Sequence, residues 1–509
     1  MRNLTQNYPN FTHAGNTLTP ASAKWHAMIM TGRNITKRKS AAGAAGAMAV
    51  MLSACTVGPD YREPRPLTPS SWAAPRPGDS DAGSLTSWWD RFDDPTLTLL
   101  QQLADASSPT LAQAVARIDQ ARATLTSRRA EGRPSVTGSA SYTHSEQRLG
   151  TGEQSITINN DGVQAGGDAS WQIDLFGKVR RNTRAARARV EAREGDRDAA
   201  RVSLAAEVAD TYIQYRGCEQ LSALYRQQAQ SQGETARLTR ISANAGFIAP
   251  ADAELTEASA ASVSSSLTDQ TAQCDLLVKS LTSLSGLEEA ALREMLAPRA
   301  GVLPEPTAFE VAAVPADVLR QRPDIASSER ELAAASEEIG VAVADLYPSL
   351  SLGGSLSTGS GARSWSFGPS LSLPIFDGGR AKAGVRSARA AYALQLATWQ
   401  EAARAAVLEI EQALVRLDAA RARQADAARA AQGYQANFAA IERLRVAGST
   451  SMIERESARR NALDAQRTLV DLRIAQARYW VALYKAVGGG WNADITFVPS
   501  ANGALVREN

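Results

Sequence analysis

Histidine and cysteine, the side chains that most often bind metals or activate nucleophiles, are scarce in this sequence. Its 509 residues include three His and three Cys. His13 and His26 precede a predicted cleavage site at Cys55, so only His144 remains in the mature chain. A metal centre or a His-based catalytic triad needs a cluster of such residues. The sequence predicts neither, and we expect a protein that is not an enzyme and binds no cofactor.

Cys55 has surroundings that predict one modification, the attachment of lipid. Basic residues 37–39 and the apolar run 41–51 precede it, in the order of a secretory signal peptide. The run is too short to span a bilayer as a helix, which takes about 20 residues. Leu52-Ser-Ala-Cys55 resembles the lipobox of bacterial lipoproteins, in which the Cys becomes the lipid-modified first residue. An ordinary secretory signal with an unrelated Cys is the alternative.

The presequence also distorts the charge of the chain. The full sequence has 55 Lys and Arg against 53 Asp and Glu, and residues 1–54 contain six of the basic residues and no acidic one. The mature chain therefore has 49 basic and 53 acidic residues, whereas nucleic-acid-binding domains are usually strongly basic. Met28 or Met30 would give a signal of conventional length, so we expect the true start there.

A local basic cluster is the exception to this balance. It consists of Arg180, Arg181, Arg184, Arg187 and Arg189. We interpret it as a solvated helix face, with binding of an anion or nucleic acid as the alternative.

Proline placement predicts two very long helices. No Pro occurs between Pro134 and Pro250 or between Pro374 and Pro499, and these stretches are rich in helix-forming residues. A helix from Gly177 to about Asn244 would measure about 100 Å, and one over 382–447 would be nearly as long. Each is followed by a second helical stretch, so we expect two antiparallel helical hairpins.

The turns of these hairpins carry helix-end signals. Gly246 and Gly448 occupy the place where a left-handed residue commonly stops a helix. Pro250 suits the first turn of the next helix, and Ser451-Met-Ile-Glu454 has the form of a capping box.

The two remaining cysteines lie at matching places in the first hairpin. Cys218 and Cys274 are each 28 residues from Gly246. We therefore expect them at the same height, where an oxidising compartment permits a disulfide. Two unrelated buried thiols are the alternative.

The chain is predicted to contain a duplicated unit. Pairs of like residues recur at offsets of 214 (Pro109 with Pro323, Pro134 with Pro348), 200 (Phe176 with Phe376, Arg180 with Arg380) and 202 (Gly246 with Gly448). The change from 214 to 200 assigns 14 extra residues to the first copy. They fall in the Gly-, Ser- and Asn-rich segment Glu146–Gly167, which we predict to be a loop. Arg322-Pro323 is interpreted as a helix start.

Four segments alternate polar and apolar residues with the period of half-buried strands, namely 135–143, 168–175, 349–357 and 366–375. Each has about the length of a tilted transmembrane β-strand. A soluble sandwich is the alternative, and we predict no other strand. Because four strands cannot close a barrel and lipid does not tolerate an open sheet edge, a membrane-spanning sheet requires several copies.

Five motifs occur in order along the mature chain: Cys55-x-x-Gly-Pro-Asp-Tyr61, Trp88-Trp-x-x-Phe-x-Asp-Pro-x-Leu97, Arg322-Pro-Asp-Ile325, Tyr347-Pro-Ser-Leu350 and Pro374-Ile-Phe-Asp-Gly-Gly379. Together they resemble the TolC-like outer membrane factor family, specifically the lipoprotein subgroup (NodT type) that serves resistance-nodulation-division efflux systems. The resemblance covers essentially all of the mature chain.

This resemblance implies a homotrimer whose chains each give four strands to a shared 12-stranded transmembrane β-barrel, continuous with a long α-helical periplasmic barrel. It implies a passive exit duct for small toxic molecules or drugs, in the outer membrane and reaching into the periplasm. The implied partners are a periplasmic adaptor (membrane fusion) protein, an inner-membrane efflux pump and outer-membrane lipid, with no nucleic acid. A protein-secretion duct of the same fold and a structural periplasmic coiled-coil adaptor lipoprotein are the alternatives.

The resemblance places the periplasmic entrance and adaptor docking at the two helical turns. The residues implied are Gly246, Asp252, Arg445, Gly448, Ser449, Ser451 and Glu454. The expected parts of the chain are the presequence (1–54), the N-terminal segment and first helices of repeat one (55–133), a β-hairpin (134–176), a long helical hairpin (177–285), a linker and the first helices of repeat two (286–347), a second β-hairpin (348–377), a second long helical hairpin (378–488) and a C-terminal tail (489–509).

Overall fold

The computed structural model of the chain describes residues 56–65, 69–74, 88–150, 156–306, 315–359, 362–490, 497–499 and 505–507. These residues all belong to one unit, Cys55–Asn509. The presequence and the predicted lipid site at Cys55 lie outside the described residues.

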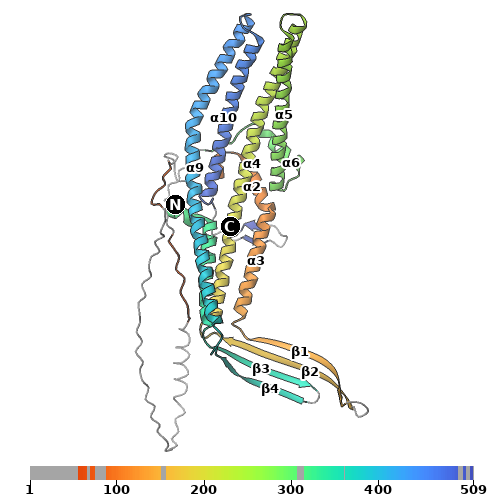
Figure 1. Cartoon of the computed structure of the whole chain (residues 1–509), viewed down its shortest axis with the longest axis vertical. Helices are drawn as coiled ribbons and strands as arrows, with labels where there is room; N and C mark the ends of the chain where they lie inside the picture. Colours follow the sequence, from red (N-terminus) through yellow and green to blue (C-terminus); the bar gives the residue numbers. More distant parts are fainter. Residues whose placement is uncertain are drawn as a thin grey trace, which may run out of the picture. The chain divides into compact units, whose positions relative to one another are not determined.

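Four antiparallel strands form one sheet in the order β1-β2-β3-β4 (Figure 1). They are β1 (Ser135–Leu149), β2 (Ile156–Ile173), β3 (Ser349–Gly359) and β4 (Ala362–Ser372). The sheet joins the two halves of the chain because β2 pairs with β1 on one side and with β3 on the other. β1 and β4 are its edge strands.

The segment Glu146–Gly167, predicted to be a loop, is mostly strand. β1 continues to Leu149 and β2 starts at Ile156, so the connection covers only residues 150–155. Gly and Asn favour strands weakly, but the cross-strand ladder gives their backbone groups hydrogen-bonding partners. At the other end, β4 stops at Ser372 rather than at 375, because Pro374 has no N–H to donate to a ladder.

Two helices of 67 residues each, α4 (Lys178–Asn244) and α9 (Arg380–Val446), start where the sheet ends. At 1.5 Å per residue each is about 100 Å long, as predicted. α5 (Pro250–Ser285) runs back along α4, and α10 (Met452–Ala486) runs back along α9 (Figure 1). α4 also packs against α10, which holds the two hairpins together.

Shorter helices precede each hairpin. α2 (Pro95–Ser107) and α3 (Pro109–Ala130) lie in the first half, and α6 (Glu289–Leu296), α7 (Pro315–Gln321) and α8 (Pro323–Ala344) in the second. Pro stands at the first position of α8, the helix start predicted from Arg322-Pro323. In the part of the chain that the structure describes, no helix is both long and apolar enough to cross a membrane.

The internal repeat is confirmed, but with a corrected offset. α3 and α8 have 22 residues each and start at Pro109 and Pro323. α4 and α9 each follow a glycine with positive φ, Gly177 and Gly379, which are 202 positions apart. Arg380 therefore corresponds to Lys178, and the predicted pairing of Arg180 with Arg380 at 200 was wrong. The first β-hairpin, Ser135–Ile173, is 15 residues longer than the second, Ser349–Ser372, and the second copy has three more residues between its last strand and its long helix, so the net difference at the helix starts is 12.

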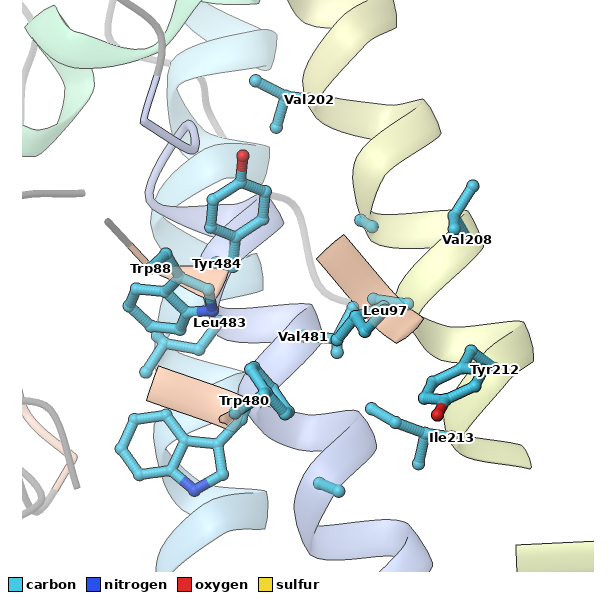
Figure 2. Close-up of a cluster of buried hydrophobic side chains, with 14 of the residues drawn as sticks. Trp88, Leu97, Val202, Val208, Tyr212, Ile213, Trp480, Val481, Leu483 and Tyr484 are labelled. Carbon is cyan, nitrogen blue, oxygen red and sulfur yellow. The ribbon is translucent and has the colours of Figure 1, made fainter. Parts of the chain in front are cut away.

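The largest hydrophobic core lies where the N-terminal segment meets both helical hairpins (Figure 2). Trp88 packs on Trp480 and Tyr484 of α10, with ring centroids 6.1 and 5.5 Å apart. α4 contributes Tyr212 and Ile213 to the same cluster. The Trp88–Leu97 motif therefore fastens α10 to α4.

Asp94, in the same motif, holds this core by hydrogen bonds. Its carboxylate accepts from the backbone N–H groups of Thr96 and Leu97 and so caps α2. The other carboxylate oxygen accepts from the Tyr212 hydroxyl at 2.8 Å. Burial raises the pKa of Tyr212 to about 12, so its hydroxyl stays a donor at neutral pH.

The C-terminal tail contains two strands that the sequence did not predict. β5 (Phe497–Pro499) pairs antiparallel with β6 (Leu505–Arg507). Each has three residues, too few for an alternating pattern to be recognised.

Candidate functional site

One face of the four-stranded sheet carries large apolar side chains that are exposed in the single chain. The register places them side by side, for example Tyr142 opposite Val163 and Leu356 opposite Trp365. Each is between 61% and 79% exposed, and together they are Val136, Tyr142, Val163, Leu356, Trp365, Phe367 and Leu371. A continuous exposed apolar surface of this kind is typical of contact with a membrane or a partner.

The opposite face of the sheet carries hydroxyl groups. The hydroxyl oxygens of cross-strand serine pairs lie within hydrogen-bonding distance: 2.8 Å for Ser355 and Ser366, 2.7 Å for Ser357 and Ser364, and 2.9 Å for Ser135 and Ser170. Alternation of apolar and polar residues along strands of 11 to 18 residues is the pattern of a membrane barrel wall, apolar toward lipid and polar toward the lumen. The chemistry of the sheet is therefore that of a wall between lipid and water.

The turns at the far ends of α4 and α9 have the same geometry. Gly246 and Gly448 have φ of 78° and 76°. The next N–H bonds the carbonyl five residues back in each turn, Phe247 to Ser242 at 3.0 Å and Ser449 to Leu444 at 2.9 Å. These are Schellman motifs, and the positive φ favours glycine at both places.

The predicted entrance residues lie at these two turns. Asp252 is in the first turn of α5, and Ser451 caps α10 by accepting from the Glu454 N–H at 3.1 Å. Arg445 donates to Glu442 at 3.1 Å, and Arg455 bonds the same carboxylate. Burial raises the pKa of Glu442, but the hydrogen bonds from Arg455 and Arg445 outweigh it and lower the pKa overall.

Apolar side chains next to the turns are exposed. Phe247 is 83% exposed and Val446 is 75% exposed, and Ile241, Leu444 and Ile453 are also exposed. Apolar side chains that are exposed together at a helical tip are typical of an interaction surface.

A buried polar group near the turns was not predicted from the sequence. The Glu456 carboxylate on α10 accepts from the Ser231 and Thr235 hydroxyls on α4, each at 3.2 Å. Residues 231–235 and 456 lie level with each other, so the two turns are at the same end of the hairpins. The carboxylate is surrounded by α4 side chains and by Arg455 and Arg459, and burial lowers the pKa of Arg459. Such a group has no signal in a sequence, because it depends on which helix faces which.

Among the residues that the structure describes, three arginines are buried, and each joins segments that are distant in the sequence. Arg216 donates to Tyr212, Glu219 and the Leu296 carbonyl. Arg322 donates to Asp324, Glu409 and the Ala486 carbonyl. Carboxylates and carbonyls offset the cost of burying these charges.

The third buried arginine, Arg181, corrects the interpretation of the basic cluster. Its guanidinium is 1% exposed and lies 3.0 Å from Glu337 and 3.1 Å from Asp60. It therefore does not belong to a solvated face. Arg184 and Arg187 are exposed, as predicted.

Residues 56–61, which follow the predicted lipid site, are fastened beside Arg181. Gly58 has a φ of 96°, and a Cβ there would come within 2.6 Å of the Gly340 backbone, so only glycine fits. The Val57 N–H bonds the Phe176 carbonyl at 3.2 Å. Thr56 therefore lies near the junction of β2 and α4, and the predicted lipid site is one residue away in sequence.

Cys218 and Cys274 are joined by a disulfide in the structure, with Cα atoms 5.6 Å apart. The bond links α4 to α5 at one height. Within the described residues, no group of three or more His, Cys, Asp or Glu side chains could hold a metal ion.

The comparisons with known proteins agree with this geometry. The family model described as "Outer membrane efflux protein" matches residues 100–287 and 314–489. "Nodulation protein T" from Rhizobium leguminosarum bv. trifolii is 31% identical, over 87% of this chain and 96% of that protein. "Probable efflux pump outer membrane protein TtgC" from Pseudomonas putida is 29% identical, over 87% of this chain and 94% of that protein.

Solved structures share the fold. The outer-membrane channel OprN has a TM-score of 0.76 and 32% identity, and the match covers 86% of this chain and all of that one. The Campylobacter jejuni CmeC outer membrane channel has a TM-score of 0.74 and 24% identity, over 86% of this chain and 96% of that one.

Proposed function

The chain belongs to the outer membrane efflux protein family, and from that premise we propose that it forms a passive trimeric exit duct for small toxic molecules or drugs. It is an outer membrane channel component of an efflux pump, as the relatives named for efflux and the channel structures indicate. The trimer, the kind of molecule exported and the partners are the finer parts of the proposal.

The observation that carries the proposal is the sheet with one apolar and one hydroxyl face. The edge strands β1 and β4 have no partner on their outer sides within the described sheet. Lipid does not tolerate such edges, so other copies must pair with them. Three copies of four strands give a 12-stranded barrel, within the range of known membrane barrels.

The partners follow from the two ends of the long helices. The sheet end lies in the outer membrane, so the turns about 100 Å away lie in the periplasm. There the exposed Phe247 and Val446 beside Asp252 and Arg445 support docking of a periplasmic adaptor protein, which would connect the duct to an inner-membrane pump. Gly246, Gly448, Ser449, Ser451 and Glu454 shape these turns, so the entrance is proposed at the same place.

Cys55 is proposed to carry lipid, with no other cofactor. Because residues 56–61 are fastened near the β2–α4 junction, a lipid on the preceding residue would lie close to the membrane surface. The disulfide between Cys218 and Cys274 is proposed to form in the cell, since the periplasm is oxidising. Counting free thiols in denatured, unreduced protein tests it: two reactive thiols would refute the bond.

Catalysis by the chain itself is not part of the proposal. The relatives are channel proteins, and the mature sequence has one His. A protein-secretion duct is the second candidate, because it would use the same sheet and helices. A structural periplasmic adaptor is disfavoured, because it would not need a sheet with an apolar outer face.

Deletion of the gene tests the function directly. We expect greater susceptibility to several antibiotics, dyes, solvents or metal ions, restored by the full chain, with an unchanged set of secreted proteins. Unchanged susceptibility to the whole panel, together with loss of a secreted protein, would favour the secretion duct instead. A delipidated chain that is monomeric and soluble without detergent would contradict both ducts.

A further inference from the structure

Within the four strands β1–β4, the hydroxyl face of the sheet carries a single ionisable side chain, Asp168 of β2. The register pairs Asp168 with Thr137 on β1 and with Ser355 on β3, so these three side chains lie on the same face. The other strand residues on that face are Ser, Thr, Asn, Gln, Gly, Ala, Leu or Ile. Because none of these side chains carries a charge, the charge of this face comes from Asp168.

The carboxylate of Asp168 has no counter-charge. Among the residues that the structure describes, none forms an ion pair with this carboxylate or donates a hydrogen bond to it, and the Thr137 hydroxyl bonds the Asp168 backbone carbonyl instead, at 3.5 Å. Asp174, which follows β2, differs. Its carboxylate accepts from two backbone N–H groups and lies 3.3 Å from the Arg180 guanidinium. The charge of Asp174 is therefore balanced locally, whereas Asp168 is exposed and unpaired.

Asp168 lies well inside the sheet in both directions. Its strand, β2, is flanked by β1 and β3 of the same chain, so Asp168 is not on an edge strand. Its partner Ser355 lies inside β3 and pairs in turn with Ser366 inside β4. In the proposed trimer, the three Asp168 carboxylates therefore form one ring partway along the barrel lumen. The membrane around the barrel has a low dielectric constant, which focuses the field of these charges into the lumen.

The size of the effect follows from the size of the barrel. Twelve strands spaced by about 4.8 Å and tilted by about 40° form a barrel with a radius of about 12 Å. At a salt concentration of about 0.01 M the screening length is about 30 Å, so all three carboxylates act on an ion at the barrel axis. With the dielectric constant of water, they enrich a monovalent cation there about threefold and deplete a monovalent anion by about the same factor.

We infer that Asp168 is a specificity-determining residue of the duct, and that its three copies make the barrel lumen selective for cationic solutes, such as protonated amines, over anionic ones. The inference rests on the proposed trimer and adds which charge of solute the barrel favours. It assigns this preference to the membrane barrel, about 100 Å from the entrance proposed at the helical turns.

Reversal potentials of the full chain in planar lipid bilayers test the inference. In a KCl gradient at about 0.01 M, we expect Asp168→Asn to lower the ratio of K⁺ to Cl⁻ permeability about tenfold, and Asp168→Lys to lower it further. At about 1 M KCl the screening length is about 3 Å, so the ratios of wild type and variants should agree. Asp161→Asn is the matched control, because Asp161 lies on β2 but on the same face as Val163. It should leave the ratio unchanged.

Two results would overturn the inference and leave the proposed duct intact. One is conducting Asp168→Asn protein with the wild-type permeability ratio in dilute KCl. The other is a changed ratio that persists at about 1 M KCl, because an altered pore shape rather than a lost charge would then be the cause. Protein that inserts without conducting would refute the duct itself.

Chemical modification at the same position separates charge from shape. Asp168→Cys should react with water-soluble methanethiosulfonate reagents. An anionic reagent should restore the wild-type permeability ratio, and a cationic reagent should lower the ratio below that of Asp168→Asn. Ala169→Cys, on the apolar face of the same strand, should stay unmodified in lipid. Equal effects of the two reagents would contradict the inference. Modification of Ala169→Cys but not of Asp168→Cys would place the apolar face in water and refute the proposed barrel.

Discussion

The contact between α4 and α10 has two halves of opposite chemistry. Near the middle of the hairpins it is apolar: Tyr212 and Ile213 of α4 belong to the same buried cluster as Trp480, Val481 and Tyr484 of α10 (Figure 2). Toward the turns it is polar: Glu456 of α10 accepts from the Ser231 and Thr235 hydroxyls of α4, and the buried side chains on this part of α4 also include Gln228, Gln232 and Thr239.

This difference determines which half can separate. Opening the apolar half exposes hydrocarbon to water, at about 25 cal/mol for each Å². Opening the polar half exchanges protein hydrogen bonds for water, and each such bond contributes only about 0.5–1.5 kcal/mol net. The structure therefore supports a fixed middle and a separable tip, at the end where the entrance is proposed.

Truncation in the apolar half should have the largest effect. Trp480→Ala removes a fully buried indole and is expected to destabilise the fold by about 3–5 kcal/mol. The loss of the helical circular dichroism signal on heating, recorded in detergent, measures this destabilisation. Trp365→Ala on the exposed face of the sheet is the control, and it should leave the helical transition unchanged. Equal shifts in the melting temperatures of Trp480→Ala and Trp365→Ala would contradict the distinction between a packed core and a lipid-facing surface.

Removing the disulfide should have the next largest effect. Cys218 lies between the apolar and polar halves of α4, and its bond to Cys274 closes 56 residues of sequence. Replacing both with Ser is expected to cost about 2–4 kcal/mol of stability. The melting temperature should fall to that of wild-type protein kept in reductant. A melting temperature unaffected by either treatment would contradict the bond.

Loss of Glu456 should act locally and less strongly. Glu456→Ala leaves the Ser231 and Thr235 hydroxyls without this acceptor and leaves Arg459 with Glu442 but not Glu456 as a counter-charge. We expect this to cost about 1–3 kcal/mol of stability. We expect faster hydrogen exchange in residues 452–466 and no change in 474–486. Asn461→Ala, an exposed change on the same part of α10, is the control. Faster exchange along the whole of α10 would mean that the two halves open together.

Acid should have the smallest effect, through Glu442. In the folded chain the pKa of Glu442 lies below its usual value of 4.5, so its ion pairs with Arg445 and Arg455 stabilise the tip fully above pH 4.5. This stabilisation is lost as the pH falls through the lower pKa of the folded chain. The group is partly exposed, so we expect less than about 1 kcal/mol. The melting temperatures of wild type and Glu442→Gln should converge on acidification. A constant difference between them would argue against the pairing.

The sequence predicted the helices and turns of this molecule better than the contacts between distant segments. Proline-free stretches and the turn glycines determine helix ends locally, so α4, α9 and both turns were placed correctly. The β-hairpin of repeat one was underestimated because Gly and Asn lower local strand propensity, while the ladder that overrides it forms between distant segments.

The candidate site was predicted to different extents for the same reason. Gly246, Gly448 and Ser451 have local signals and were found. Glu456 and Arg216 were missed, and Arg181 was wrongly interpreted as solvated, because their roles depend on partners 80 to more than 220 positions away. The sequence indicated an offset of 202 only at Gly246 and Gly448, and the positive φ angles of Gly177 and Gly379 show that the same offset holds from the starts of α4 and α9.

Single-channel conductance of the purified full chain in planar lipid bilayers tests the central claim most directly. We expect discrete conductance steps from wild-type protein, larger steps from Glu456→Ala, and steps of wild-type size from Asn461→Ala. Protein that inserts without conducting would contradict the duct. Identical steps from wild type and Glu456→Ala would contradict the separable tip.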